Sequence, residues 1–355
     1  MSTMQRFLAL IGLVSILTAC GSSAATQAPT TAPTTAAAAT ATTASEPTAA
    51  ATEAAAEATT APADSAAGTR TIKHVLGETT ITGTPQRVVV LEWVYVENLL
   101  ALGVQPVGVA DIEAYNTWVD VPVELGPDAT DVGTRGEANL ETIASLKPDL
   151  IITLKYDADK NYPQYSAIAP TLVFNPYPES GDQYAEMIDT FNTIADVLGK
   201  TEEAKAVLSK MEQTYADAKQ TLATAGFENA PYVLAQAYTS NNAAEIRLFT
   251  DNSMIAKLIA KTGLKNGWTD SAFQVYGFST VSSEVLAQLG DVHFMYVVAN
   301  DDNPFASGTV KPFWDSLEFV KKGQAYPLGG DVWFFGGPLS AEVLAQRVVK
   351  SLTKQ

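Results

Sequence analysis

The apolar residues from Thr71 onward follow two repeats, which predict strands and helices that alternate along the chain. Short unbroken apolar runs bounded by Gly or Pro are typical of buried strands. We expect such strands at 87–91, 104–110, 150–154, 171–174, 232–237 and 292–298. Apolar residues three and four positions apart predict helices at 94–101, 139–146, 183–198, 202–223, 253–261 and from Ala341 onward. Strands separated by helices indicate parallel β-α units and an α/β fold.

The longest predicted helix, 202–223, has one continuous apolar stripe. The stripe contains Ala204, Val207, Leu208, Met211, Tyr215, Ala218 and Leu222. A helix of this length extends roughly 33 Å, about the width of a small domain. It could simply cover one core. Because a new series of strands and helices begins directly after Pro231, we predict instead a rigid strut that joins two lobes.

One arrangement of residues occurs in both halves of the folded sequence. Segments 139–146 and 282–289 each begin with a capping residue and precede an aspartate and a buried strand. A glutamate follows the capping residue two positions later, Glu141 in the first segment and Glu284 in the second. Helix capping alone explains either glutamate. Because the two glutamates occupy corresponding positions in the two halves, we predict instead that they are exposed carboxylates, one per lobe, that bind basic groups of a partner.

The first twenty residues have the features of a secretion signal. Arg6 precedes the apolar run Phe7–Leu17, which ends in Leu17-Thr18-Ala19-Cys20. The run is too short for a transmembrane helix, which needs about 20 apolar residues. Leu-Thr-Ala-Cys resembles the lipobox of bacterial lipoproteins, in which the cysteine is acylated and becomes the mature N-terminus. A plain secretion signal with an incidental cysteine is the alternative. We interpret residues 1–20 as a lipoprotein signal peptide and Cys20 as the lipidation site.

Residues 21–70 form a low-complexity segment that we predict to be a disordered tether. Up to Gly68 it is nearly all Ala, Thr, Ser and Pro, without Leu, Ile, Val, Met or any aromatic residue. Such a composition buries too little apolar area to offset its backbone entropy. A flexible tether of this length reaches about 40 Å. The predicted organisation beyond it is an N-terminal lobe at 71–199, an inter-lobe helix at 200–225 and a C-terminal lobe at 226–355.

Composition excludes several classes of function. The formal charge of −17 argues against nucleic acid, whose phosphates need clustered Lys and Arg. One cysteine and two histidines leave little scope for a disulfide framework or a transition-metal site, and we expect His74 and His293 to be structural. No nucleophile elbow, zincin pair or Walker loop occurs, so we predict neither an enzyme nor a cofactor. With only six arginines, an anion site would use one or two of them.

Several motifs resemble one transport family. The runs 85–92 and 99–111 resemble the opening of class III substrate-binding proteins of ABC importers. Gly133-Thr-Arg135, then 139–141 and 146–152, are similar to the family's most recognisable block, in the form typical of the ferric-siderophore and ferric-dicitrate branch. The resemblance extends from about Thr71 to the C-terminus.

The second half resembles the family more loosely, chiefly at 281–289 and 336–340. The resemblance implies two Rossmann-like lobes joined by one long helix, with the ligand between them. It also implies that Glu141 and Glu284 bind arginines of the two permease subunits. The expected protein is a monomeric lipoprotein, anchored on the periplasmic or cell-surface side of a membrane, that delivers a ferric siderophore or ferric dicitrate to an ABC permease. Haem or cobalamin carriers of the same fold remain alternatives, as does a stalked surface enzyme or adhesin.

The ligand of such a fold is expected outside the carboxyl ends of the strands. Ferric citrate and many ferric siderophores are anionic and already complete the coordination of iron. The protein would therefore contribute guanidinium groups and aromatic rings, and no atom to the metal. Arg135 is the first candidate because of the matched Gly-Thr-Arg triplet, and ordinary core packing or surface ion pairing is the alternative for each candidate. The predicted ligand-binding residues are Arg135, Arg247, Trp93, Tyr95, Tyr156, Tyr276 and Trp333.

Overall fold

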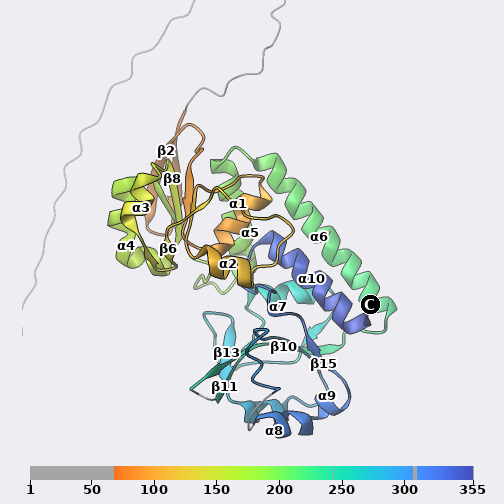
Figure 1. The fold of residues 1–355 in the computed structure, drawn as a ribbon. Coiled ribbons are helices and arrows are strands. Elements are labelled where there is room, and N and C mark those ends of the chain that lie inside the picture. Colours follow the sequence, from red (N-terminus) through yellow and green to blue (C-terminus); the bar gives the residue numbers. More distant parts are fainter. Residues whose placement is uncertain (1–67, 242, 307–309, 355) are drawn as a thin grey trace, which may run out of the picture. The chain divides into compact units, whose positions relative to one another are not determined.

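The computed structural model describes residues 68–241, 243–306 and 310–354, which all belong to one compact unit. The predicted signal peptide, the lipidation site Cys20 and nearly all of the predicted tether lie outside these residues. Two large β-sheets, two small two-stranded sheets and the surrounding helices make up this unit (Figure 1). None of the helices described is both long enough and apolar enough to cross a membrane.

The first sheet is entirely parallel, as predicted, with strand order β5-β4-β3-β8-β9. Its central residues, among them Val89 and Ile151, are fully buried between helices. The strands are β3 (Val88–Val90), β4 (Gly108–Val109), β5 (Thr130–Asp131), β8 (Leu150–Leu154) and β9 (Thr171–Phe174). Its helices are α1 (Trp93–Ala101), α2 (Ile112–Trp118), α3 (Leu140–Ser145), α4 (Lys155–Ile168) and α5 (Gln183–Val197). Strand β4 is shorter than the predicted 104–110, since Pro106 has no N–H for the sheet.

A hairpin of β1 (Thr69–His74) and β2 (Gly77–Thr82) precedes the first sheet. The folded part therefore begins at Thr69, two residues before the predicted start, and the last residues assigned to the tether belong to this hairpin. Arg70 holds the hairpin against the end of α5, because its guanidinium donates hydrogen bonds of 2.8 Å to the carbonyl oxygens of Asp196 and Val197.

The second sheet is mixed, which corrects the prediction of parallel units throughout. Strand β10 is parallel to β14 and β12 but antiparallel to β11, which in turn pairs antiparallel with β13. The β10–β11 turn contains Asn241 at φ +51°, a conformation that asparagine tolerates well. The strands are β10 (Pro231–Ser240), β11 (Ala243–Phe249), β12 (Lys265–Asn266), β13 (Phe278–Val281), β14 (His293–Val297) and β15 (Ala325–Pro327). Around them lie α7 (Met254–Lys261), the 3-10 helix η1 (Ser283–Gln288), α8 (Val310–Ser316) and α9 (Glu318–Lys321).

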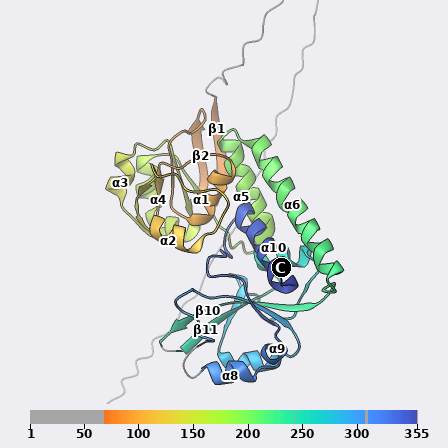
Figure 2. The same cartoon turned by 45° about the vertical axis from the view of Figure 1, so that its right-hand side comes forward.

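Two long helices, α6 (Thr201–Thr224) and α10 (Pro338–Thr353), pack along each other (Figures 1 and 2). Ala204 of α6 belongs to the core of the first sheet, Met211 belongs to the core of the second, and Leu208 contacts both. The hydroxyl of Tyr215 donates a hydrogen bond of 2.8 Å to the carbonyl oxygen of Ala341 in α10. Helix α6 thus contributes to both cores, as a strut would, whereas the exact lobe boundaries remain predictions.

Two local predictions were wrong. Tyr156 was expected just outside the end of the strand 150–154, but it lies in α4, a helix that was not predicted and that begins directly after β8. Helix α4 has a weak apolar pattern and contains Pro163. Its inward face is held instead by the buried carboxylate of Asp157, which accepts hydrogen bonds from Thr153, Asn161 and Tyr165. The segment 282–289 forms a 3-10 helix rather than an α-helix.

Candidate functional site

Two adjoining cavities, each of about 310 Å³, lie between residues of the first and second sheets and their loops. Both are lined by Arg135, Arg247, Trp333 and Phe335, so they form one continuous space, called here the cleft. Its size lies within the range of small-ligand sites. The other residues that line it include Glu92, Trp93, Val94, Leu154, Pro176, Tyr177, Gln236, Tyr238, Tyr276 and Phe278.

Arg135 is presented to the cleft by a tight hairpin of β6 (Gly133–Thr134) and β7 (Glu137–Ala138). Gly133 has φ +101°, and a Cβ there would lie 3.0 Å from the carbonyl oxygen of Glu137, so the turn requires glycine. The Cζ atom of Arg135 lies 3.5 Å from the centre of the Trp93 ring, a cation-π contact. Its Nη1 donates a hydrogen bond of 2.9 Å to Oε1 of Glu92. Ring and carboxylate together hold this guanidinium in place.

Glu92 is the N-cap of α1 and the one acidic residue that lines the cleft among the described residues. Its Oε1 accepts a hydrogen bond of 2.9 Å from the Trp93 backbone N–H, and its side chain is only 14% exposed. Burial raises the pKa of this carboxyl above its usual value, against the opposing attraction of Arg135. The negative charge of Asp157 raises the Glu92 pKa a little further.

Arg247 comes from the second sheet, on β11, opposite Gln236 of β10. Its Nη1 donates to Gln236 Oε1 at 3.1 Å and its Nη2 to the Tyr238 hydroxyl at 3.3 Å. The Cζ atom lies 4.8 Å from the Phe278 ring centre. Its Nε is buried and has no hydrogen-bond partner among the described residues. The cleft therefore receives one guanidinium from the side of each sheet.

Aromatic rings form much of the remaining wall. Trp333 packs edge-on against Trp93 at 5.0 Å and against Phe335 at 5.4 Å. Tyr177 and Tyr276 meet edge-on at 5.0 Å, and Tyr276 is 52% exposed at the rim. The indole N–H of Trp333 is buried and has no hydrogen-bond partner among the described residues.

Five of the seven predicted ligand residues meet in the cleft: Arg135, Arg247, Trp93, Tyr276 and Trp333. Tyr95 does not line it, because two positions along a helix turn the side chain to the far side of α1, where Tyr95 packs against Phe174. Tyr156 lines neither cavity and is 69% exposed on α4.

Sequence reasoning missed Tyr177, Phe278 and the charge of Glu92. Tyr177 follows β9, so the rule that ligands lie at the carboxyl ends of parallel strands could have found it. Phe278 lies on β13, a strand that was not predicted. Glu92 closely follows β3, so the same rule could have found its carboxylate.

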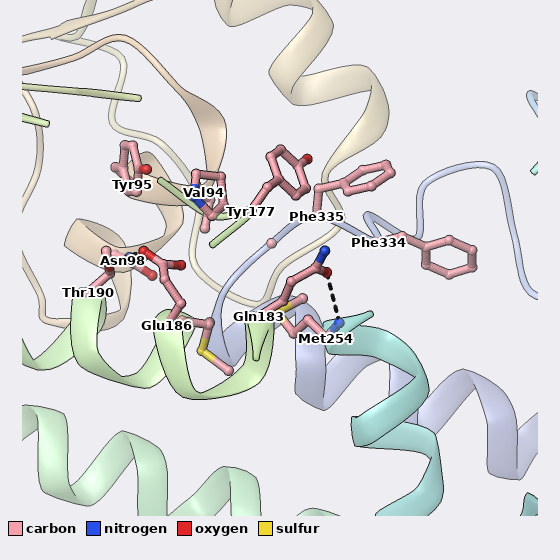
Figure 3. Close-up of a pocket in the computed structure, with 13 residues that line it drawn as sticks. Val94, Tyr95, Asn98, Tyr177, Gln183, Glu186, Thr190, Met254, Phe334 and Phe335 are labelled. Carbon is pink, nitrogen blue, oxygen red and sulfur yellow. Dashed lines mark hydrogen bonds between the residues drawn. The ribbon is translucent and has the colours of Figure 1, made fainter. Parts of the chain in front are cut away.

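A smaller cavity of about 40 Å³ adjoins the cleft and shares Val94, Tyr177 and Phe335 with it (Figure 3). Asn98 lies at its inner end, and both polar atoms of the Asn98 side chain lack a partner in the described structure. Burial raises the pKa of Glu186 in its wall to about 7. Gln183, also in the wall, accepts a hydrogen bond of 3.0 Å from the Met254 backbone N–H (Figure 3). This space suits a few water molecules and not a metal chelate.

Both predicted docking glutamates are exposed. Glu141 is in the first turn of α3, where Asn139 Oδ1 caps the helix by accepting a hydrogen bond of 3.0 Å from the Thr142 N–H. Glu284 is in the first turn of η1. Within the part of the chain that the structure describes, neither carboxylate forms a salt bridge. Both carboxylates are therefore exposed and available to a partner.

The two histidines take part in local contacts. His74 Nε2 is 3.0 Å from the Thr79 hydroxyl, and His293 Nδ1 is 3.2 Å from the Tyr326 hydroxyl. Burial lowers the pKa of each imidazole. Among the described residues, no group of three or more His, Cys, Asp and Glu side chains is placed to hold a metal ion.

Comparison with known proteins gives consistent matches. Residues 88–332 match the model of the family described as periplasmic binding protein. The chain is 35% identical over 290 residues to the Fe(3+)-citrate-binding protein YfmC of Bacillus subtilis, covering 80% of this chain and 86% of YfmC. It is 32% identical over 278 residues to the putative ABC transporter substrate-binding lipoprotein YhfQ of the same organism, covering 74% of this chain and 81% of YhfQ.

Among solved structures, the chain is similar to the Fe3+-Desferal-bound siderophore-binding protein FhuD of Vibrio cholerae. The TM-score is 0.68 at 27% identity, and the match covers 76% of this chain and 98% of FhuD. The family match includes both sheets, α6 and every cleft residue named above except Trp333 and Phe335, which follow it directly. The chain belongs to the periplasmic binding protein family.

Proposed function

We propose that this chain is the solute-binding component of an ABC importer and captures an anionic Fe3+ chelate of the ferric citrate type. The observation that supports it most is the pair of guanidinium groups, Arg135 and Arg247, which come from different sheets and line one aromatic-walled cleft. A guanidinium group can donate two parallel hydrogen bonds to a carboxylate, and aromatic rings can pack against the outer surface of a chelate. The similarity to YfmC points to the same ligand class.

A ferric hydroxamate is the second candidate, supported by the similarity to FhuD. Hydroxamate complexes of iron are commonly neutral or cationic, so two arginines against one glutamate in the cleft favour the anionic chelate. In either case the chelator surrounds the iron, and the role of the protein is to recognise the chelate surface. Haem and cobalamin are weaker candidates, because YfmC and FhuD are described as binding ferric citrate and a ferric siderophore.

Arg135→Ala should weaken binding of ferric citrate by about 1.5–3 kcal/mol, or roughly 10- to 150-fold in Kd, because a charge-assisted hydrogen bond is lost. Quenching of tryptophan fluorescence measures this, since Trp93 and Trp333 line the cleft. Arg87→Ala is the matched control, because the Arg87 guanidinium lies away from the cleft and donates to the carbonyl oxygen of Leu146. Equal affinities of wild type and Arg135→Ala would exclude Arg135 from the site, and failure of every ferric chelate to bind the wild type would reject the proposed function.

We also propose that the mature protein is held at the outer face of a membrane by lipid on Cys20, with residues 21–68 as a tether. The lipobox-like sequence supports this proposal, as does the similarity to YhfQ, which is described as a lipoprotein. Two or more acyl chains give stable anchoring where one chain does not. Cys20→Ser should move the protein from the membrane pellet to the soluble extracytoplasmic fraction. A variant that stays in the pellet would contradict lipid anchoring.

A further inference from the structure

Glu92 is an acidic side chain that lines a cleft proposed to bind an anion, where its negative charge would repel the ligand. Its carboxylate lies beside Arg135 and lines the same cavity as Arg247. A single oxygen, Oε1, accepts both of its hydrogen bonds, from the Trp93 N–H and from Arg135 Nη1. Oε2 has no hydrogen-bond partner in the described structure, and it is not among the fully buried unpaired atoms. One oxygen of Glu92 is therefore available at the cleft.

The charges around Glu92 come from four elements and one loop. Arg135, on the β6–β7 hairpin, is the neighbouring cation, and Arg247 of β11 lies across the cavity. Asp157 of α4 is negative and saturated with donors, because Thr153, Asn161 and Tyr165 all bond to it. Tyr95 of α1 and Tyr177 after β9 are neutral, since burial raises the pKa of both phenols. In the free protein, Glu92 thus depends on Arg135 for most of its electrostatic stabilisation.

A bound anion would make the ionised form of Glu92 less favourable, for two reasons. It would add negative charge to a partly desolvated space next to the Glu92 carboxylate. It would also compete with Glu92 for the guanidinium of Arg135. Both effects disfavour the ionised form of Glu92, and the free protein already has this carboxyl with a raised pKa.

We propose that Glu92 takes up one proton when the cleft binds an anionic chelate. This inference rests on the proposed function. The proton comes from solvent and bonds to the free oxygen, Oε2. Glu92 then changes from a repulsive carboxylate into a neutral group whose O–H can donate to an oxygen of the chelate. Protonation makes the net charge of the cleft more positive by one. The guanidinium of Arg135 can then bind the ligand without competition from a charged Glu92.

The coupling sets the direction of the pH dependence. At a pH below the Glu92 pKa of the free protein, the residue is already protonated and binding takes up no further proton. Above that pKa, binding must draw a proton from solvent, so affinity falls as pH rises, by up to tenfold per unit. Replacing the carboxyl with an amide removes the coupling, since glutamine keeps an oxygen for the Trp93 N–H and cannot titrate.

Calorimetric titration with ferric citrate, in buffers of different ionisation enthalpy at pH 7, counts the protons taken up. We expect wild type to take up measurably more protons than Glu92→Gln, by a difference of up to one per chelate. The comparison at one pH cancels the protonation of the chelate itself. Glu113→Gln, at an exposed glutamate of α2, is the matched control and should behave as wild type.

Equal proton uptake by wild type and Glu92→Gln, with ferric citrate bound by both, would overturn the proton coupling and leave the proposed function intact. Lack of binding of any ferric chelate to wild type would instead reject the proposed function, and the coupling with it. Thermal unfolding checks that Glu92→Gln is folded. If it is not, the wild-type measurement decides, because uptake no greater than that expected from the free chelate's own titration overturns the coupling.

Discussion

Replacing Glu141 and Glu284 together with alanine is expected to abolish uptake of ferric citrate by cells while binding to the purified protein stays unchanged. Ligand binding should be unchanged because both carboxylates are exposed on the surface and neither lines the cleft. A hydrogen bond from Ser282 holds the pKa of the Glu284 carboxyl below its usual value, which favours the charged form. Each glutamate would form a charge-assisted contact with a basic residue of one permease subunit.

Uptake of radioactive iron as ferric citrate measures the transport effect, in cells whose own copy of the gene is deleted, and fluorescence quenching measures binding. The matched control is Glu113→Ala with Glu228→Ala, which removes the same charge from two other exposed glutamates. Uptake at the wild-type rate by the Glu141/Glu284 variant would contradict the docking role. Loss of uptake by the control variant as well would mean that net charge, rather than these two positions, matters.

Glu97→Ala should lower the free energy of unfolding by about 3–5 kcal/mol, the largest effect on stability that we expect from one substitution. Glu97 in α1 is fully buried, and its carboxylate accepts hydrogen bonds from the backbone of Gly337 at 2.9 Å and of Ser340 at 2.8 Å. The Ser340 hydroxyl donates a third bond of 2.6 Å. These donors form the N-terminus of α10, where the helix dipole favours an anion. Alanine would leave all of them buried without an acceptor.

Denaturant unfolding followed by circular dichroism measures this loss. Ser340→Ala is the graded control, since it removes only the hydroxyl bond and should cost about 1 kcal/mol. A loss below 1 kcal/mol for Glu97→Ala would mean that water or a rearranged backbone satisfies the α10 N-terminus equally well.

The parts of the fold that follow simple repeats could be predicted from the sequence. The parallel strands β3, β8, β9, β10 and β14 are short apolar runs, and α6 has an unbroken apolar stripe. The antiparallel strand β11 was missed because its buried residues Ile246 and Leu248 alternate with polar side chains, so the strand has no unbroken apolar run. Helix α4 was missed for a related reason, since a polar network around Asp157 holds it rather than an apolar face.

The site was predictable where a motif or a strand end fixed the position of a residue. Arg135 could be placed because the Gly133-Thr-Arg135 triplet matches a motif of the family. Tyr95 could not be excluded, since the sequence did not establish that α1 begins at Trp93 and turns Tyr95 away from the cleft. The ion pair of Glu92 with Arg135 joins residues 43 positions apart, so only the three-dimensional arrangement reveals it.

The contact between Glu97 and the start of α10 also constrains the order of folding. The Glu97 carboxylate and its donor Ser340 are separated by 243 positions in the chain, so the buried acid of α1 is satisfied only when the last helix has formed. Contacts of such long range are slow to form, because loop closure precedes the gain from the contact. A nascent chain that has emerged only as far as β15 would still contain this unpaired buried acid. The first half of the protein therefore reaches its final stability only after synthesis is nearly complete.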